Sequence, residues 1–113
     1  VTGKEPMTSE AYVKLRELRR ELLREEYKEY RDGEVAGDIV EIVDGLLDII
    51  VIAWGTLLAY VGKEMAEAAA TQVAISNLSK VDGTLGEIVR REDGKLLKPE
   101  GWEPPDIKGA LGL

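Results

Sequence analysis

The chain has 113 residues, of which 44% are hydrophobic and 33% are charged, and its formal net charge is -7 at pH 7. These values fit one small domain over residues 1–113, and the negative charge argues against binding to a nucleic acid polymer or to an anionic membrane. The absence of Cys and His excludes disulfides, thiolate metal sites, imidazole bases and most zinc sites. Any chemistry must therefore come from carboxylates, Lys, Arg, hydroxyl groups or a metal.

The first predicted helix begins near Thr8 or Ser9, either of which can cap it, and runs to about Arg31. Leucines in its first half follow the three- and four-residue spacing of a buried face: Leu15, Leu18 and Leu22. Continuing that face by one turn at a time leads to three acidic residues: Glu25, Glu26 and Glu29. The acids therefore prolong the predicted buried face of this helix.

The second predicted helix spans roughly Asp38 to Val61 and ends at Gly62. A second acidic group lies in its first half: Glu41, Asp44 and Asp48. From Leu46 onward this helix is apolar nearly all round, which is typical of a helix buried against several neighbours. Its most apolar part is too short to span a bilayer, so we expect no membrane association.

A third helix is predicted from about Lys63 to Ser79, so that the helical core covers about residues 8–80. The remainder, about residues 86–113, is expected to form a short C-terminal β-hairpin and an extended arm. The hairpin prediction rests on two short apolar runs around an Asp-Gly turn between residues 88 and 98.

The predicted fold class is all-α. A lone hairpin and a helix that is apolar on every side are hard to satisfy within one short chain. We therefore expect a homodimer or a dimer of dimers, in which the first two helices of each subunit form an antiparallel four-helix bundle.

The two acidic groups predict a divalent metal site. The short connection over residues 32–37 favours antiparallel helices, which could bring Glu26 and Glu29 together with Glu41 and Asp44. Oxygen ligands select Mg²⁺ or Mn²⁺. The simpler interpretation is a solvated face with weak ion pairs, and Glu41 also fits a helix-capping arrangement with Asp38. Asp48 is different, because its apolar neighbours make it hard to leave solvated.

Three segments of the chain carry a family resemblance. Residues 25–29 (EEYKE) and 41–48 (EIVDGLLD) resemble the ExxE, spacer, ExxD pattern of the all-α MazG-like nucleotide pyrophosphohydrolases. Residues 76–81 (SNLSKV) resemble an N-x-S-K element of the phosphoribosyl-ATP pyrophosphohydrolase-like branch, common in bacteriophages and bacteria. Residues 91–98 and 102–107 resemble its C-terminal signature.

The resemblance covers about residues 10–108 and implies a role for eight polar residues. It implies that Mg²⁺, or alternatively Mn²⁺, is held by the four motif acids: Glu26, Glu29, Glu41 and Asp44. Two further acids match an extra ligand or a water-activating base: Glu25 and Asp48. Two residues match groups that contact the nucleotide: Lys80 and Asn77. One departure stands inside the second motif, because many relatives carry Glu where this chain has Gly45.

The activity implied is Mg²⁺-dependent hydrolysis of a nucleoside triphosphate, or a related nucleotide such as phosphoribosyl-ATP, to the monophosphate and pyrophosphate. The expected partners are the nucleotide substrate and further copies of the chain. No signal peptide is visible in the sequence, and we expect a cytoplasmic protein. Two alternatives stay open: a non-catalytic oligomeric relative that binds nucleotide or metal, and a plain helical oligomerisation module.

Overall fold

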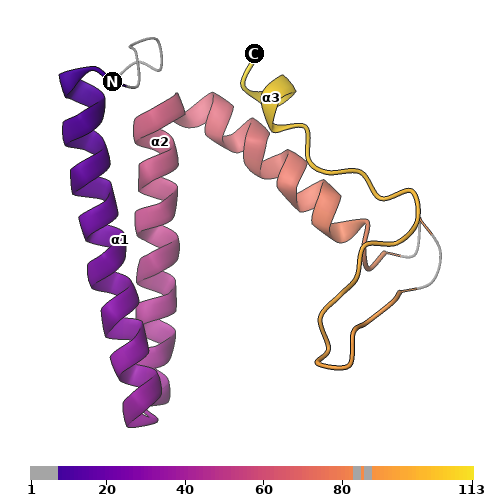
Figure 1. Cartoon of the computed structure of the whole chain (residues 1–113), viewed down its shortest axis with the longest axis horizontal. Coiled ribbons are helices and arrows are strands. Elements are labelled where there is room, and N and C mark those ends of the chain that lie inside the picture. Colours follow the sequence, from indigo (N-terminus) through magenta and orange to yellow (C-terminus); the bar gives the residue numbers. More distant parts are fainter. Residues whose placement is uncertain (1–7, 83–84, 86–87) are drawn as a thin grey trace. The chain divides into compact units, whose positions relative to one another are not determined.

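The computed structural model describes residues 8–82, 85 and 88–113 (Figure 1). It contains three helices, α1 (Glu10–Ala36), α2 (Ile39–Leu78) and the short α3 (Ile107–Ala110). No strand forms in the described part of the chain, which confirms the all-α prediction. The chain divides into two compact units, residues 1–62 and residues 63–113, which are described separately below.

Helix α1 begins where the sequence predicts, because the Ser9 side chain accepts a hydrogen bond from the Tyr12 backbone N–H at 3.3 Å. It ends at Ala36, five residues beyond the predicted end near Arg31. The helix stops at Gly37, whose φ of 65° lies in the left-handed region, and whose N–H is donated to the Glu34 carbonyl. Residues 32–36, which were expected to belong to the connection, continue the helix, and Gly33 among them is buried at a close contact with α2.

Helix α2 merges the second and third predicted helices. Asp38 caps its start, with Oδ1 accepting from the backbone N–H groups of Val40 and Glu41 at 3.1 and 3.3 Å. The predicted break at Gly62 is present as a local kink, where φ is 80° and ψ is 171°. Such a positive φ is readily adopted only by glycine, and the helix resumes at the next residue.

In the first unit, α1 and the first half of α2 run side by side in opposite directions (Figure 1). Two glycines let the helices approach closely. A Cβ built on Gly45 would lie 2.8 Å from the Cα of Tyr30, and one built on Gly33 would lie 3.1 Å from the Cβ of Glu41. From the first contact to the second, the position on α1 moves forward by three residues, from Tyr30 to Gly33. The position on α2 moves back by four, from Gly45 to Glu41, as antiparallel helices require.

Farther from the turn, Arg19 ties α1 to α2. Its Nε donates to the Thr56 hydroxyl at 3.0 Å, and one terminal nitrogen donates to the Ile52 carbonyl at 3.1 Å. Near the start of α1, the rings of Tyr12 and Tyr60 stack with centroids 5.8 Å apart. These contacts keep the same antiparallel register along the whole helix pair.

The first half of α2 carries an apolar face that is exposed to solvent. On α2 the exposed apolar side chains include Val40, Val43, Leu47, Ile50 and Val51. Monomeric soluble proteins rarely leave so many large apolar groups together in water. By length and composition alone, α2 is also long and apolar enough to cross a membrane.

In the second unit, the C-terminal arm is fastened to the end of α2. The indole N–H of Trp102 donates to the Ser76 carbonyl at 2.8 Å, and the Ser76 hydroxyl donates to the Glu103 carbonyl at 2.9 Å. Asp106 then caps α3 by accepting from the Gly109 N–H at 3.0 Å. The extended arm is therefore held to the helix at two successive residues, through the indole of Trp102 and the backbone carbonyl of Glu103.

The predicted two-stranded hairpin is not seen. One isolated antiparallel bridge, between Arg90 and Leu96, spans the Asp-Gly turn, and no strand extends it among the described residues. A two-stranded hairpin alone is at best marginally stable in water, and Pro99 has no N–H to continue the pairing. The first two residues of the predicted hairpin-and-arm range, 86 and 87, lie outside the described residues.

Candidate metal site

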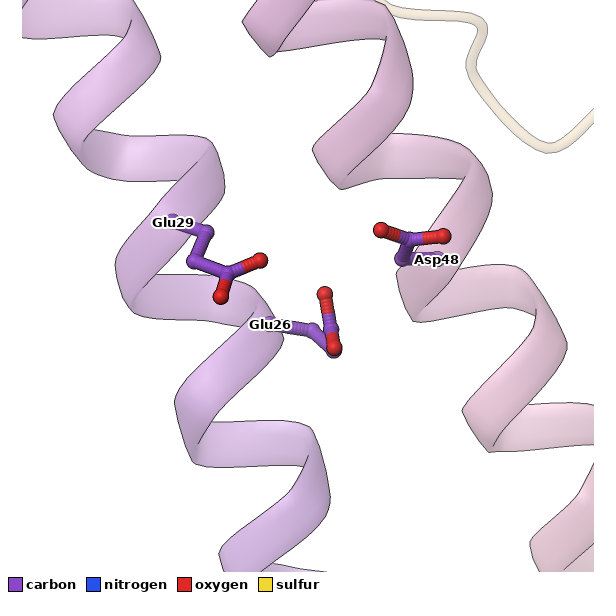
Figure 2. Close-up of side chains that lie close together, drawn as sticks. All are labelled: Glu26, Glu29 and Asp48. Atoms are coloured by element: carbon purple, nitrogen blue, oxygen red, sulfur yellow. The ribbon is translucent and has the colours of Figure 1, made fainter.

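Three carboxylates meet between the two helices of the first unit. Glu26 and Glu29 project from α1 and Asp48 projects from α2, so that their side chains point toward one another (Figure 2). One oxygen from each of the three lies within 4.8 Å of the others. Three oxygen atoms at this separation can reach a single cation placed between them.

The register of the helix pair explains why these three meet. Glu26 lies seven residues, or two turns, before Gly33, and Asp48 lies seven residues after Glu41. Because Gly33 and Glu41 are in contact, two turns in opposite directions bring Glu26 opposite Asp48. Glu29 joins them because residues three apart share a helix face.

The site is electrostatically strained without a cation. Desolvation raises the pKa of Glu26 above its ordinary value of 4.5, and the neighbouring carboxylates of Glu29 and Asp48 raise it further. One oxygen of Glu26, Oε2, is fully covered and has no hydrogen-bond partner among the described residues. Either a proton on Glu26 or a nearby positive group would relieve the repulsion between these carboxylates.

The donor set fits a hard divalent cation. All three groups offer carboxylate oxygens, which suit Mg²⁺, Mn²⁺ or Ca²⁺ and do not favour softer metals. Glu26 and Asp48 are half-buried while Glu29 is exposed, so the site is open on the side of Glu29. A cation held there would keep positions for water or for the oxygens of a bound ligand.

Two of the four acids expected to hold the metal are not in this group. Glu41 is exposed and lies opposite Gly33, beside a shallow hollow of about 290 Å³ near the turn between the helices. Its backbone N–H donates to the capping side chain of Asp38, whereas the Asp38 N–H donates to the Gly33 carbonyl and not to the Glu41 side chain. Asp44 is also exposed and borders an apolar hollow of about 390 Å³ on α2.

Asp48 takes the place that the sequence motif suggested for Glu41 and Asp44. From the family resemblance, Asp48 was expected to be only an extra ligand or a water-activating base. The available signal was the spacing of Glu41 and Asp48, which lie two full turns apart and so share a face. Which of these two acids faces the carboxylates of α1 is set by the register between the helices. That register follows from the residues at which the two helices touch.

Glu25 and Asp44 flank the three converging acids. Glu25 is exposed and precedes Glu29 by four residues, one turn away on the same face of α1. Asp44 precedes Asp48 by four residues in the same way on α2. Neither residue belongs to the group of three converging carboxylates.

The two residues expected to contact a nucleotide lie in the second unit. The Lys80 ammonium donates to the Asn77 side-chain carbonyl at 3.2 Å, just past the end of α2. Lys80 also lies over the ring of Trp102, and so does Lys98. Neither Trp102 nor Lys98 was predicted as a site residue, since a Lys and a Trp on a loop carry no sequence pattern that joins them.

Comparisons of the chain with protein-family models and with curated proteins found no match.

Proposed function

We propose that the protein is an Mg²⁺-dependent nucleotide pyrophosphohydrolase, which converts a nucleoside triphosphate or a related nucleotide to the monophosphate and pyrophosphate. The observation that carries the proposal is the convergence of Glu26, Glu29 and Asp48, with a covered, unpartnered oxygen on Glu26. The resemblance of the two acidic segments to MazG-like enzymes supports the choice of substrate. Glu26 and Glu29 are the two acids common to the motif and to the converging group.

In this proposal Glu26, Glu29 and Asp48 hold the cation. The cation would neutralise charge on the phosphate chain and activate water. Glu25 accepts a proton from the water that attacks phosphorus, while the bond from that phosphorus to the departing pyrophosphate breaks. Its exposed position at the edge of the site allows the proton to pass on to solvent.

The resemblance also assigns Lys80 and Asn77 to the nucleotide. Their hydrogen bond fixes the Lys80 ammonium next to the end of α2, and an ammonium is a suitable partner for a phosphate oxygen. We therefore keep both residues as proposed substrate contacts.

We further propose that two copies of the chain pair through the exposed apolar side of α2 and complete a four-helix bundle. The support is the run of exposed apolar residues on that side, beginning with Val40 and Val43. Sedimentation equilibrium is the test. A dimer that dissociates on Val43→Lys substitution is expected, and a monomer at all concentrations would contradict the pairing.

The activity is tested by screening ribo- and deoxyribonucleoside triphosphates for pyrophosphate release with Mg²⁺ or Mn²⁺. Glu26→Gln and Asp48→Asn are each expected to lower the rate by about 100-fold or more, since each removes a ligand. Glu41→Gln is the matched control on α2 and is expected to retain most of the activity. Equal losses in Glu41→Gln and Asp48→Asn would contradict the ligand assignment.

The same screen, combined with thermal unfolding, separates the two alternatives, a non-catalytic binding protein and a plain helical oligomerisation module. Stabilisation by Mg²⁺ and nucleotide without release of pyrophosphate would indicate a non-catalytic binding protein. A plain oligomerisation module predicts that Mg²⁺ does not raise the melting temperature of the wild type and that neutralising the acids causes no loss of function.

A further inference from the structure

The three converging acids and the exposed apolar face of α2 share an edge. Leu47, the residue before Asp48, is 56% exposed, and Val51, three residues after Asp48 on the same side of the helix, is 66% exposed. One turn before Asp48, the exposed Asp44 borders the apolar hollow of about 390 Å³ together with Leu47 and three other apolar residues. The acid that α2 contributes to the proposed metal site is therefore flanked by largely exposed apolar side chains.

This apolar face is large enough to pair with a second copy of the chain. Seven large apolar residues of this part of α2 are exposed: Ile39, Val40, Val43, Leu46, Leu47, Ile50 and Val51. Together they expose roughly 750 Å², close to the area of about 800 Å² that each partner contributes to a standard protein–protein interface. A second copy presents the same face, so that pairing two copies covers both faces at once.

Pairing through this face has a consequence for the three acids. A partner that lies against Leu47 and Val51 excludes water from the neighbourhood of Asp48, and one oxygen of Asp48 lies within 4.8 Å of an oxygen of Glu26 and of Glu29. Like charges repel more strongly where water is excluded, because the local dielectric constant falls, and a cation among them is attracted more strongly for the same reason. The loss of water therefore opposes pairing of the metal-free protein and favours pairing of the metal-bound protein.

We propose that binding of a divalent cation and pairing of two copies are coupled, so that the pair forms preferentially with a cation at Glu26, Glu29 and Asp48. The coupling rests on the proposed metal site and on the proposed pairing through α2, and it adds a link that neither requires by itself. Because such a coupling is reciprocal, the pair must also bind the cation more tightly than a single chain does. A typical coupling is about tenfold for each site, so two sites in one pair lower the dimer dissociation constant by about 100-fold at saturating Mg²⁺.

The coupling is tested on the wild-type chain, so that misfolding of a variant cannot obscure the result. Sedimentation equilibrium over a wide range of protein concentrations measures pairing in EDTA and in saturating MgCl₂, with NaCl added to the EDTA buffer to match the ionic strength. We expect a dimer dissociation constant about 100-fold lower in MgCl₂. Calorimetric titration with MgCl₂ gives the reciprocal measurement, in which the cation should bind about tenfold more tightly at protein concentrations that favour the pair.

Two substitutions locate the effect of the cation. Glu26→Gln removes one negative charge and one ligand, so in EDTA this variant should pair more tightly than the wild type does in EDTA. Mg²⁺ should then change its dimer dissociation constant by less than about threefold, because the coupling is lost. Glu41→Gln is the control, since it removes an acid of α2 that lies outside the converging group, and it should keep the full response to Mg²⁺. Circular dichroism verifies that both variants keep their helix content.

Three results would overturn the coupling. Equal dimer dissociation constants in EDTA and in MgCl₂ would overturn it and leave the proposed pairing intact. A response to Mg²⁺ as large in Glu26→Gln as in the wild type would place the effect outside the three acids. A monomer under every condition would overturn the coupling together with the proposed pairing. None of these measurements depends on turnover, so a failure of the proposed hydrolase activity is a separate result from the pyrophosphate-release screen.

Discussion

Replacing Gly45 by alanine tests the close approach of α1 and α2 on which the acidic site depends. A Cβ at this position would lie 2.8 Å from the Cα of Tyr30, 2.9 Å from its Cβ and 3.0 Å from its backbone nitrogen. Two of these atoms belong to the backbone, so a side-chain rotation in Tyr30 cannot relieve the clash. The helices must move apart, which would also separate Glu26 from Asp48.

Two opposing effects set the magnitude. Alanine in place of glycine inside a helix favours the helix by up to about 1 kcal/mol. Overpacking at a tight contact costs about 1–3 kcal/mol, and contact with backbone atoms places Gly45→Ala in the upper half of that range. We therefore expect a net loss of about 1–2 kcal/mol, which corresponds to a melting temperature lower by roughly 4–8 °C for a domain of this size.

The assay is thermal and urea unfolding followed by circular dichroism, with Gly33→Ala as the comparison. At Gly33 the nearest atoms would be 3.1 to 3.2 Å from the new Cβ, a milder contact, so a smaller change is expected. The stabilisation of Gly45→Ala by Mg²⁺ should also be weaker than that of the wild type. A higher melting temperature in Gly45→Ala, as helix propensity alone predicts, would refute the close approach.

Three further changes probe other parts of the helix pair. Because the folded state raises the pKa of Glu26 above 4.5, the metal-free protein should lose stability as the pH rises through that raised pKa. The measurement is the urea midpoint from pH 4 to 8, and Glu26→Gln should remove this loss. Asp38→Ala should cost about 1 kcal/mol in urea unfolding through the lost helix cap, while Asp38→Asn keeps the cap and most of the stability. Arg19→Met keeps the aliphatic stem but removes the bonds to Thr56 and Ile52, and should cost about 1–3 kcal/mol; an unchanged urea midpoint would mean that these bonds add nothing.

Local signals predicted much of the helical structure. The cap at Ser9, the cap at Asp38 and the break at Gly62 are each decided by a few neighbouring residues, and each is found as expected. The end of α1 was misplaced because Gly33 marks a helix contact and not a helix end. A glycine needed for close packing and one needed for a turn look alike in a sequence, and only the partner helix distinguishes them.

The same limit applies to the acids. Spacing within one helix correctly grouped Glu26 with Glu29, because that relation is local. Which acids of α2 face Glu26 and Glu29 depends on the register between the two helices. Spacing along one helix does not reveal that register. In the structure Gly45 occupies the contact one turn before Asp48, and its missing side chain lets Tyr30 approach. Gly45, with no side chain at this contact, therefore helps the helices to come close enough for Asp48 to meet Glu26 and Glu29.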